Sequence, residues 1–389
     1  MPSKVNGVDV GALVATVGAI AEDGNVGKFE FRGKTVWKQG AQVETTFTGH
    51  KQSGKDTTRE TPHVWKGDEP TGLLGTGMAQ GPTDTLLHAM SHCVTVTTAY
   101  HGAARGIPIT AMTVKATGHL DLQGFLGLNP KKRAGFREIH LQMHIDSPAE
   151  TKDIYDLYRF AQGHSPICMT VRNPVKIDFD YDVDVVDEED SYKPEEDDRH
   201  GVSFKGVCDT VQAVKEDPAK MGPARFFSET EWKGGAQVES TFSKFEHPLG
   251  NVQERNEPIK LVGDEPIVLL GKDSGPGPTE TVLHGVGNCM SVGSSYFSAA
   301  EGIKLKEFSI DFDGDVDLQG FSDVNDSVTP GYSAIRAKMR ARASGCTKEK
   351  LMEFCKMLPN RSPICDSVAN PVHVTFGLTH NGKEVSALE

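Results

Sequence analysis

Four of the seven cysteines fall into two couples that repeat along the chain. Cys93 precedes Cys168 and, at an offset of 196 residues (289 − 93 = 196), Cys289 precedes Cys365. Two thiols in one site are enough for a redox cycle in which one sulfur attacks an oxidant and the other closes a disulfide. Core packing is the alternative for Cys93 taken alone, because burial in a low dielectric raises a thiol pKa and makes the thiol inert.

The repeat extends well beyond the cysteines and covers most of the chain. The segment Gly81-Pro-Thr-Asp-Thr-Leu-Leu-His88 returns as Gly277-Pro-Thr-Glu-Thr-Val-Leu-His284. Further matches are Gly67-Asp-Glu-Pro70 with Gly263-Asp-Glu-Pro266, Asp121-Leu-Gln-Gly-Phe125 with Asp317-Leu-Gln-Gly-Phe321, and Ser165-Pro-Ile-Cys168 with Ser362-Pro-Ile-Cys365. A period near 196 residues is too long for a solenoid and indicates two complete domains. We predict domains at 1–187 and 204–389, joined by a solvated acidic linker at 188–203.

An attacking thiol needs a cation beside it, and arginine suits this role because it stays charged and donates through a fork. Arg59 and Arg255 are the arginines matched by the common offset (255 − 59 = 196). Solvated loop charges are an equally good interpretation of both. Asp84 and Glu280 could orient the arginines, although carboxylates in a first helical turn more often cap the helix.

The paired histidines His88 and His284 precede the helix cysteines by five residues. Five helical steps turn the chain by about 500°, so each histidine points away from the sulfur in its own helix. We expect hydrogen-bonded interior histidines, with a place facing the other copy as the alternative. Zinc binding by His88, His92 and Cys93 is rejected because the second copy has Asn288 at the middle position. No metal or cofactor is expected.

Local signals place the cysteines on helices between strands. Alternating segments at 29–47 and 226–242 predict an antiparallel meander in each copy. Proline at the first helical position predicts helices that begin at Pro82 and Pro278, and glycine ends them near Gly106 and Gly302. Strands are expected at 113–122 and 137–145, and second helices at 149–162 and 347–358. A serine-proline start then places Cys168 and Cys365 in the first turn of a short helix, where the helix end would stabilise a thiolate, before a final strand.

Composition limits the binding partners and the cellular compartment that we expect for the protein. The net charge of −13 disfavours nucleic acid and anionic membranes as partners, and no segment is long enough to span a bilayer. The apolar stretch 10–21 imitates a signal peptide, but a more polar counterpart at 207–214 indicates a leading helix in each copy. An odd number of dispersed cysteines favours a reducing compartment, and we expect the cytoplasm. The cysteines without counterparts are interpreted as small core or surface residues: Cys208, Cys346 and Cys355.

These motifs resemble the OsmC/Ohr family, in which a proline and an acidic residue precede a helix cysteine and a Gly-Ile pair. The resemblance covers most of residues 28–185 and, comparably, 225–380. It implies an α+β fold in which each domain has an antiparallel meander, central helices and further strands. Family members are obligate homodimers, so the resemblance implies that this chain packs two domains as an intramolecular pseudo-dimer, with a higher oligomer possible.

The resemblance also implies a thiol-dependent peroxidase that reduces organic hydroperoxides or hydrogen peroxide. By position, Cys93 and Cys289 resemble the attacking cysteines, and Cys168 and Cys365 resemble the resolving ones, with a dithiol or lipoyl reductant restoring the thiols. If only one site is active, the Cys365 site is favoured, because the Asp that follows is closer to the family pattern.

Two departures from the family pattern keep other functions open. Thr83 and Thr279 stand where peroxidases have glutamate, as in the less characterised OsmC-like branch. Arg32 and Arg225 rival Arg59 and Arg255 as the activating arginines. The alternative is a non-peroxidatic OsmC-like protein that binds a small apolar or thiol-bearing molecule between the domains. A structural or stress-protective role is the third possibility.

Overall fold

A computed structural model describes residues 4–247 and 251–386 of the 389-residue chain. The first copy begins with β1 (Lys4–Val5), β2 (Val8–Asp9), α1 (Val10–Glu22) and a 3-10 turn, η1 (Gly24–Gly27). It continues with β3 (Lys28–Gln39), β4 (Gln42–Gln52), β5 (Lys55–Gly67), η2 (Thr71–Leu73), α2 (Pro82–Ala104), β6 (Ala111–Asp121), α3 (Leu122–Phe125), β7 (Glu138–Asp146), α4 (Thr151–His164), α5 (Pro166–Arg172) and β8 (Ile177–Asp187).

The second copy repeats this order almost element for element. It begins with β9 (Asp198–Arg199), β10 (Val202–Ser203), α6 (Phe204–Glu216), α7 (Pro218–Met221), β11 (Pro223–Gly234), β12 (Gln237–His247) and β13 (Asn251–Gly263). It ends with η3 (Ile267–Leu269), α8 (Pro278–Glu301), β14 (Lys304–Asp317), α9 (Leu318–Phe321), β15 (Tyr332–Ser344), α10 (Lys348–Arg361), α11 (Pro363–Ala369), β16 (His373–His380) and β17 (Lys383–Glu384). The leading helices α1 and α6 and the short helices that carry Cys168 and Cys365 lie where the sequence predicts them.

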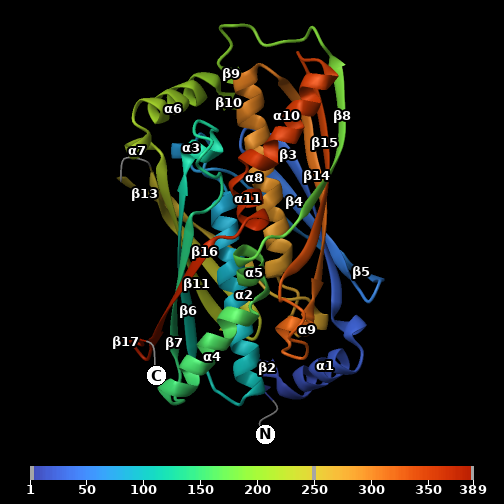
Figure 1. The fold of residues 1–389 in the computed structure, drawn as a ribbon, viewed down its shortest axis with the longest axis vertical. Helices are drawn as coiled ribbons and strands as arrows, with labels where there is room; N and C mark the ends of the chain where they lie inside the picture. The colour runs from blue at the N-terminus through green and yellow to red at the C-terminus, as the bar shows by residue number, and fades with distance from the viewer. Residues whose placement is uncertain (1–3, 248–250, 387–389) are drawn as a thin grey trace.

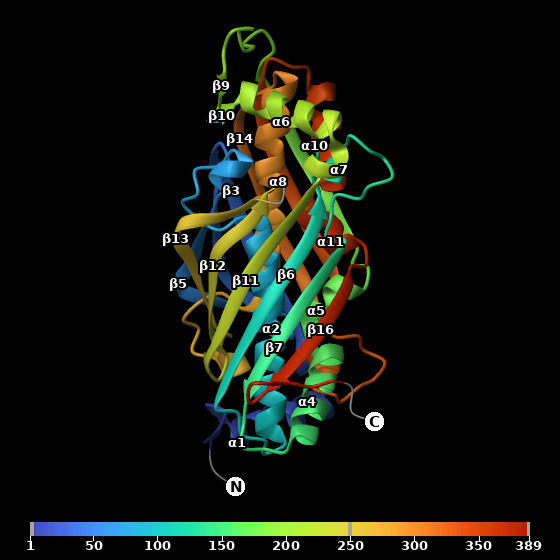
Figure 2. The same cartoon turned by 90° about the vertical axis from the view of Figure 1, so that its left-hand side faces the viewer.

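Each of the two large sheets is built from both copies. The seven-stranded sheet has the order β13-β12-β11-β6-β7-β16-β17, and the six-stranded sheet has the order β5-β4-β3-β14-β15-β8. The first strand of each meander therefore pairs with a middle strand of the other copy. β3 pairs with β14, with Phe29 opposite Val316, and β11 pairs with β6, with Phe226 opposite Gly118. Figure 2 shows the seven-stranded sheet, in which β11 runs beside β6.

The last long strand of each copy also crosses over. β8 lies parallel to β15 of the second copy, with Ile335 opposite Ile177, and β16 lies parallel to β7 of the first copy. The helices α4 and α5 precede β8 as the crossover that a parallel strand requires, but they deliver the strand to the other copy's sheet. The sequence predicts the two final strands without their exchange.

The two long helices α2 and α8 lie between the sheets (Figure 1). Each starts with proline at the first helical position, where its missing N–H costs nothing. Nearly every residue of both helices is buried, including polar ones, because sheets cover the helices on both sides. α2 and α8 also pack directly against each other, so the thiol-bearing helices form the shared core of the two copies.

The pseudo-dimer expected from the sequence is thus the arrangement of a single chain. Neither copy holds a complete sheet of its own, since every large sheet needs strands from both. Covalent linkage makes this association intramolecular and independent of protein concentration. Within the described residues, no helix combines the length and apolar character needed to cross a membrane.

The acidic segment predicted as a solvated linker is tied to the second copy. Asp190 accepts hydrogen bonds from Lys304 and Lys306, and the buried Arg199 donates to the carbonyl oxygen of Ala299. The hairpin of β9 and β10, at 198–203, is the counterpart of the hairpin of β1 and β2. The second structural repeat therefore begins at Asp198, inside the segment 188–203.

Candidate active site

The two cysteines of each couple lie on helices of one copy that pack against each other. Ile167, the neighbour of Cys168, donates its backbone N–H to Sγ of Cys93 at 3.3 Å, and the Cys168 thiol donates to the carbonyl oxygen of Met90 at 3.9 Å. The second couple has the same arrangement, since the N–H of Ile364 hydrogen bonds to Cys289. The first turn of each short helix thus faces the cysteine of the long helix. The sequence analysis expected this helix end to stabilise a thiolate of Cys168 or Cys365 instead.

Burial raises the pKa of all four thiols, which is the opposite of the shift expected for activated nucleophiles. Desolvation is the largest cause in each case, and it raises the pKa of Cys289 to about 12 and that of Cys168 to about 11. The pKa values of Cys93 and Cys365 are raised as well, also first by burial and then by the neighbouring cysteine of the couple. In this structure the four thiols are therefore protonated at neutral pH.

The predicted arginines and carboxylates pair across the two copies. Arg59 on β5 binds Glu280 at the start of α8 at 2.5 Å, and also binds Asp273 at 2.8 Å. Arg255 on β13 forms the matching pair with Asp84 at the start of α2. Asp84 and Glu280 also accept the N–H of the residue before each helix, at 3.0 Å, so each carboxylate caps a helix and holds an arginine.

Neither arginine reaches a sulfur atom. Among the described residues, no arginine donates a hydrogen bond to any of the four thiols, and the expected cations Arg59 and Arg255 are paired with Glu280 and Asp84 instead. The rival arginines lie farther out: Arg32 pairs with Glu30 and Asp56, and Arg225 pairs with Glu246 with 44% of its side chain exposed. All four arginines lie on strands, so the sequence pattern alone could not exclude Arg32 and Arg225.

The two arginines differ in how completely they are satisfied. Both side chains are only 7% exposed, but the Nε and Nη1 atoms of Arg255 have no hydrogen-bond partner among the described residues. The difference arises because Asp273, which binds Arg59 with two oxygens, has Gly77 as its counterpart in the first copy. The copies have therefore diverged in the charge around their sites.

Glu69 and Glu265 are site residues that the sequence analysis missed. Each lies in the loop before a long helix, and Asp68 fixes the first loop by accepting the N–H groups of Glu69, Thr76 and Met78. Both glutamates are buried, and burial followed by nearby carboxylates raises their pKa values well above the ordinary range. The repeated motif Gly67-Asp-Glu-Pro70 could have pointed to Glu69 and Glu265, but its residue types indicate no particular chemistry.

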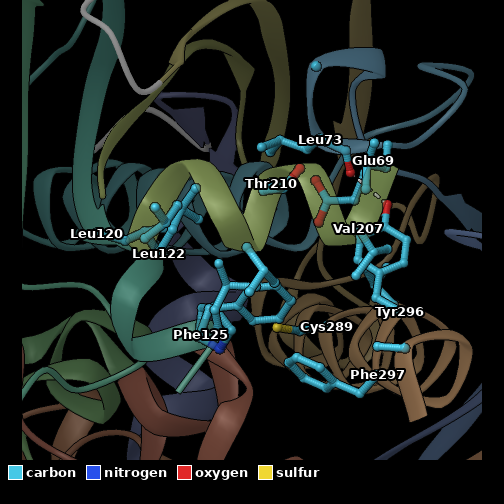
Figure 3. A pocket seen from close by; sticks show the side chains of 18 of the residues that line it. Glu69, Leu73, Leu120, Leu122, Phe125, Val207, Thr210, Cys289, Tyr296 and Phe297 are labelled. Carbon is cyan, nitrogen blue, oxygen red and sulfur yellow. Dashed lines mark hydrogen bonds between the residues drawn. The ribbon is translucent and has the colours of Figure 1, made fainter. Parts of the chain in front are cut away.

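Each helix thiol opens onto a cavity built from both copies. The cavity at Cys289 has a volume of about 450 Å³ and is lined by Glu69 and Thr83 of the first copy and by Val207 and Tyr296 of the second. Figure 3 shows the Cys289 sulfur between Phe125 and Phe297, with Glu69 across the cavity. The Cys93 cavity, with Glu265 and Thr279 in its wall, holds only about 60 Å³. Thr83 and Thr279, which replace the expected glutamates, thus face the thiol of the other copy.

Both copies of the chain match one known protein family. The model of the OsmC family, described as "OsmC-like protein", matches residues 75–180 and again 271–377. The chain belongs to the OsmC-like family. The crystal structure of an OsmC like protein from Mycoplasma pneumoniae matches with 20% identity over 37% of this chain and 87% of that chain, with a TM-score of 0.29. No curated protein matches the sequence. The two family matches identify the chain as a tandem OsmC-like protein.

The paired histidines of this OsmC-like protein lie in the core between the copies. His88 bonds to Ser240 at 2.6 Å and His284 bonds to Thr45 at 2.7 Å, and each partner belongs to the other copy. Burial lowers the pKa of His284 to about 3, so its ring is neutral. These contacts fit the expected hydrogen-bonded interior histidines. No group of three or more potential metal ligands occurs in the described part of the chain.

The three unmatched cysteines lie outside the site. Cys346 and Cys355 are buried and Cys208 is exposed on α6. The described residues contain no disulfide, and all seven cysteines are free.

The buried glutamates predict a stability that falls as pH rises. A carboxyl whose folded pKa is raised binds its proton more tightly in the folded protein, so stability is lost above the unfolded value of about 4.3. Glu69→Gln should therefore gain stability over the wild type at pH 8 and lose that advantage at pH 4, as measured by urea unfolding. Asp190→Asn is the control of opposite sign, because hydrogen bonds from Lys304 and Lys306 lower the pKa of Asp190. A pH-independent effect of Glu69→Gln would contradict the assignment.

Proposed function

We propose that the protein is a thiol-dependent peroxidase that reduces hydroperoxides. The observation that carries the proposal is the common design of both sites, in which a helix thiol borders a cavity and a second thiol of the same copy lies beside it. An apolar wall with a few convergent polar groups is typical of a site for a small organic molecule. Cys93 and Cys289 face the cavities and are the attacking thiols. Cys168 and Cys365 are the resolving thiols.

Glu69 supplies the proton transfer that the protonated Cys289 thiol needs. As the sulfur attacks the terminal oxygen of ROOH, an S–O bond forms, the O–O bond breaks, and RO⁻ leaves. Glu69 accepts the thiol proton and passes a proton to RO⁻, so the products are a sulfenic acid and ROH. A carboxyl with a raised pKa is suited to this exchange, because burial makes it hold a proton more strongly than an exposed carboxylate does. Glu265 has the same role beside Cys93.

The second thiol completes the turnover. The Cys365 sulfur attacks the Cys289 sulfenic acid, a disulfide forms, and water leaves. An external dithiol, of small-molecule or lipoyl type, then reduces the disulfide and is itself oxidised to a disulfide. The partners of the protein in this scheme are a hydroperoxide and a dithiol reductant.

Disulfide mapping tests the proposal directly. One equivalent of hydrogen peroxide per site should convert the reduced protein to Cys93–Cys168 and Cys289–Cys365 disulfides, detected by peptide mass spectrometry. Cys168→Ser and Cys365→Ser are the matched controls, in which the partner cysteine should stop at a sulfenic acid that dimedone traps. Thiols that stay reduced after this treatment would rule the peroxidase out.

Binding without turnover is the second candidate function. The raised pKa of Cys289, at about 12, and the apolar cavity of about 450 Å³ both suit a site that holds a small apolar or thiol-bearing molecule. Native mass spectrometry of the purified protein distinguishes the two functions. A retained organic molecule, together with thiols that are inert to hydroperoxide, would favour binding, and an empty cavity with disulfide formation would favour the peroxidase.

A further inference from the structure

The two cavities occupy equivalent places but differ greatly in size. Each is bounded by a glutamate, a threonine, a phenylalanine and a tyrosine at matched positions, such as Tyr296 at Cys289 and Tyr100 at Cys93. The volumes are nevertheless about 450 and 60 Å³. The smaller space lies well below the range of small-molecule pockets, about 300–1,000 Å³, whereas the larger falls within it.

The leading helices account for part of this difference. α6 forms a wall of the Cys289 cavity and α1 forms the equivalent wall at Cys93 (Figure 3 shows α6 with Val207 and Thr210). At matched positions, α6 carries Val207 and Val214 where α1 carries Leu13 and Ile20. All four side chains are buried. Each pair differs by one methylene group, and both differences enlarge the Cys289 cavity.

We propose that the two thiol sites of this chain take different substrates. The Cys289 site takes bulky apolar hydroperoxides, with the peroxide group at Cys289 and Glu69 and the apolar part under α6. The Cys93 site admits only hydrogen peroxide and similarly small hydroperoxides. Val207 and Val214, with their counterparts Leu13 and Ile20, are the specificity-determining residues. This inference rests on the proposed peroxidase function for its reaction, but the difference in cavity size can be tested without turnover.

The two thiols and the glutamate are matched at both sites, so we assign the difference in substrate to access and fit. One extra methylene in a closely fitting apolar pocket changes kcat/KM by about 10–200-fold. Two such groups on one helix face therefore contribute to the preference of the Cys93 site for smaller substrates. The polar ends of the two cavities match, because Glu69 and Glu265 stand at equivalent positions and are buried alike.

Single-site variants separate the two activities. Cys93→Ser leaves only the Cys289 site, and Cys289→Ser leaves only the Cys93 site. The ratio of kcat/KM for cumene hydroperoxide to that for hydrogen peroxide should be at least about tenfold higher in Cys93→Ser than in Cys289→Ser. Adding Val207→Leu and Val214→Ile to Cys93→Ser should lower this ratio about tenfold or more, and adding Leu13→Val and Ile20→Val to Cys289→Ser should raise it. Equal ratios in all four proteins would overturn the proposal.

A binding measurement keeps the proposal testable if no hydroperoxide is reduced. The neutral fluorescent probe 1-aminoanthracene should bind the full chain with a stoichiometry of one, and Val207→Leu with Val214→Ile should weaken its binding. Leu13→Val with Ile20→Val is the matched control, and should leave binding at the first site unchanged. Two equal sites in the wild type, or none, would overturn the proposal. One site without any peroxidase activity would reject the proposed function alone and leave the unequal cavities standing.

Discussion

Replacing Cys93 and Cys289 together by serine should lower hydroperoxide consumption by a factor on the order of 1,000 or more. The expected loss is this large because the serine hydroxyl cannot replace the sulfur atom that receives the peroxide oxygen, and removal of a nucleophile eliminates the whole reaction path. The measurement is the initial rate of cumene hydroperoxide loss with a dithiol present. Both sulfurs lie in well-packed helices, and serine is nearly the same size, so the fold should be retained.

The controls for this prediction are the unmatched cysteines. Cys346→Ser and Cys355→Ser remove buried thiols that border neither cavity, and should leave the rate within a factor of about two. Circular dichroism of each variant verifies that the protein is folded. A double variant that consumes hydroperoxide at the wild-type rate would show that the helix thiols are not the attacking groups.

Replacing Arg59 by methionine should destabilise the protein by about 3–5 kcal/mol. Methionine keeps most of the packing, but Glu280 is fully buried and would lose its counterion. The pKa of Glu265 would rise further in this variant, because the charge of Arg59 lowers it in the wild type. The free energy of unfolding in urea measures the effect.

Two further variants calibrate the Arg59 result. In Asp273→Gly, Arg59 keeps one carboxylate partner, as Arg255 has. This variant should lose less stability than Arg59→Met because the pair with Glu280 remains. Arg340→Met removes an arginine that is 36% exposed and paired with Asp311 on the sheet surface, where an ion pair contributes about 0–1 kcal/mol. If Arg59→Met costs no more than Arg340→Met, the buried cross-copy pair does not stabilise the fold.

Local sequence signals were sufficient for the elements that carry the thiols. Proline at the start and glycine after the end bound α2 and α8 correctly, since these residues act through their own backbone conformations, as with Gly302 in the left-handed region. The serine-proline start likewise placed Cys168 and Cys365 in the first turns of α5 and α11. The repeat itself indicated two domains, because a duplication is visible without any knowledge of long-range contacts.

The pairing across copies could not be read from the sequence in this way. A strand such as β8 has the same alternation of residues whether it pairs within its own copy or with β15 of the other. The role of Glu69 and the raised thiol pKa values depend on burial, which arises only when both copies close around the site. The family resemblance supplied the two-fold arrangement, whereas the partners of Arg59 and Arg255 needed the structure.

The exchange of strands has a consequence for synthesis on the ribosome. β3 ends at Gln39 and its neighbour β14 begins at Lys304, 265 residues later (304 − 39 = 265). Because a ribosome adds about 5–20 residues per second, the edge of β3 stays unpaired for roughly 13–53 s before β14 is synthesised. The pairs among β6, β7, β11, β12 and β13 involve only residues up to Gly263, so they can form earlier. The amino-terminal meander therefore exposes an unpaired strand edge for the longest time and is the segment in greatest need of a chaperone during translation.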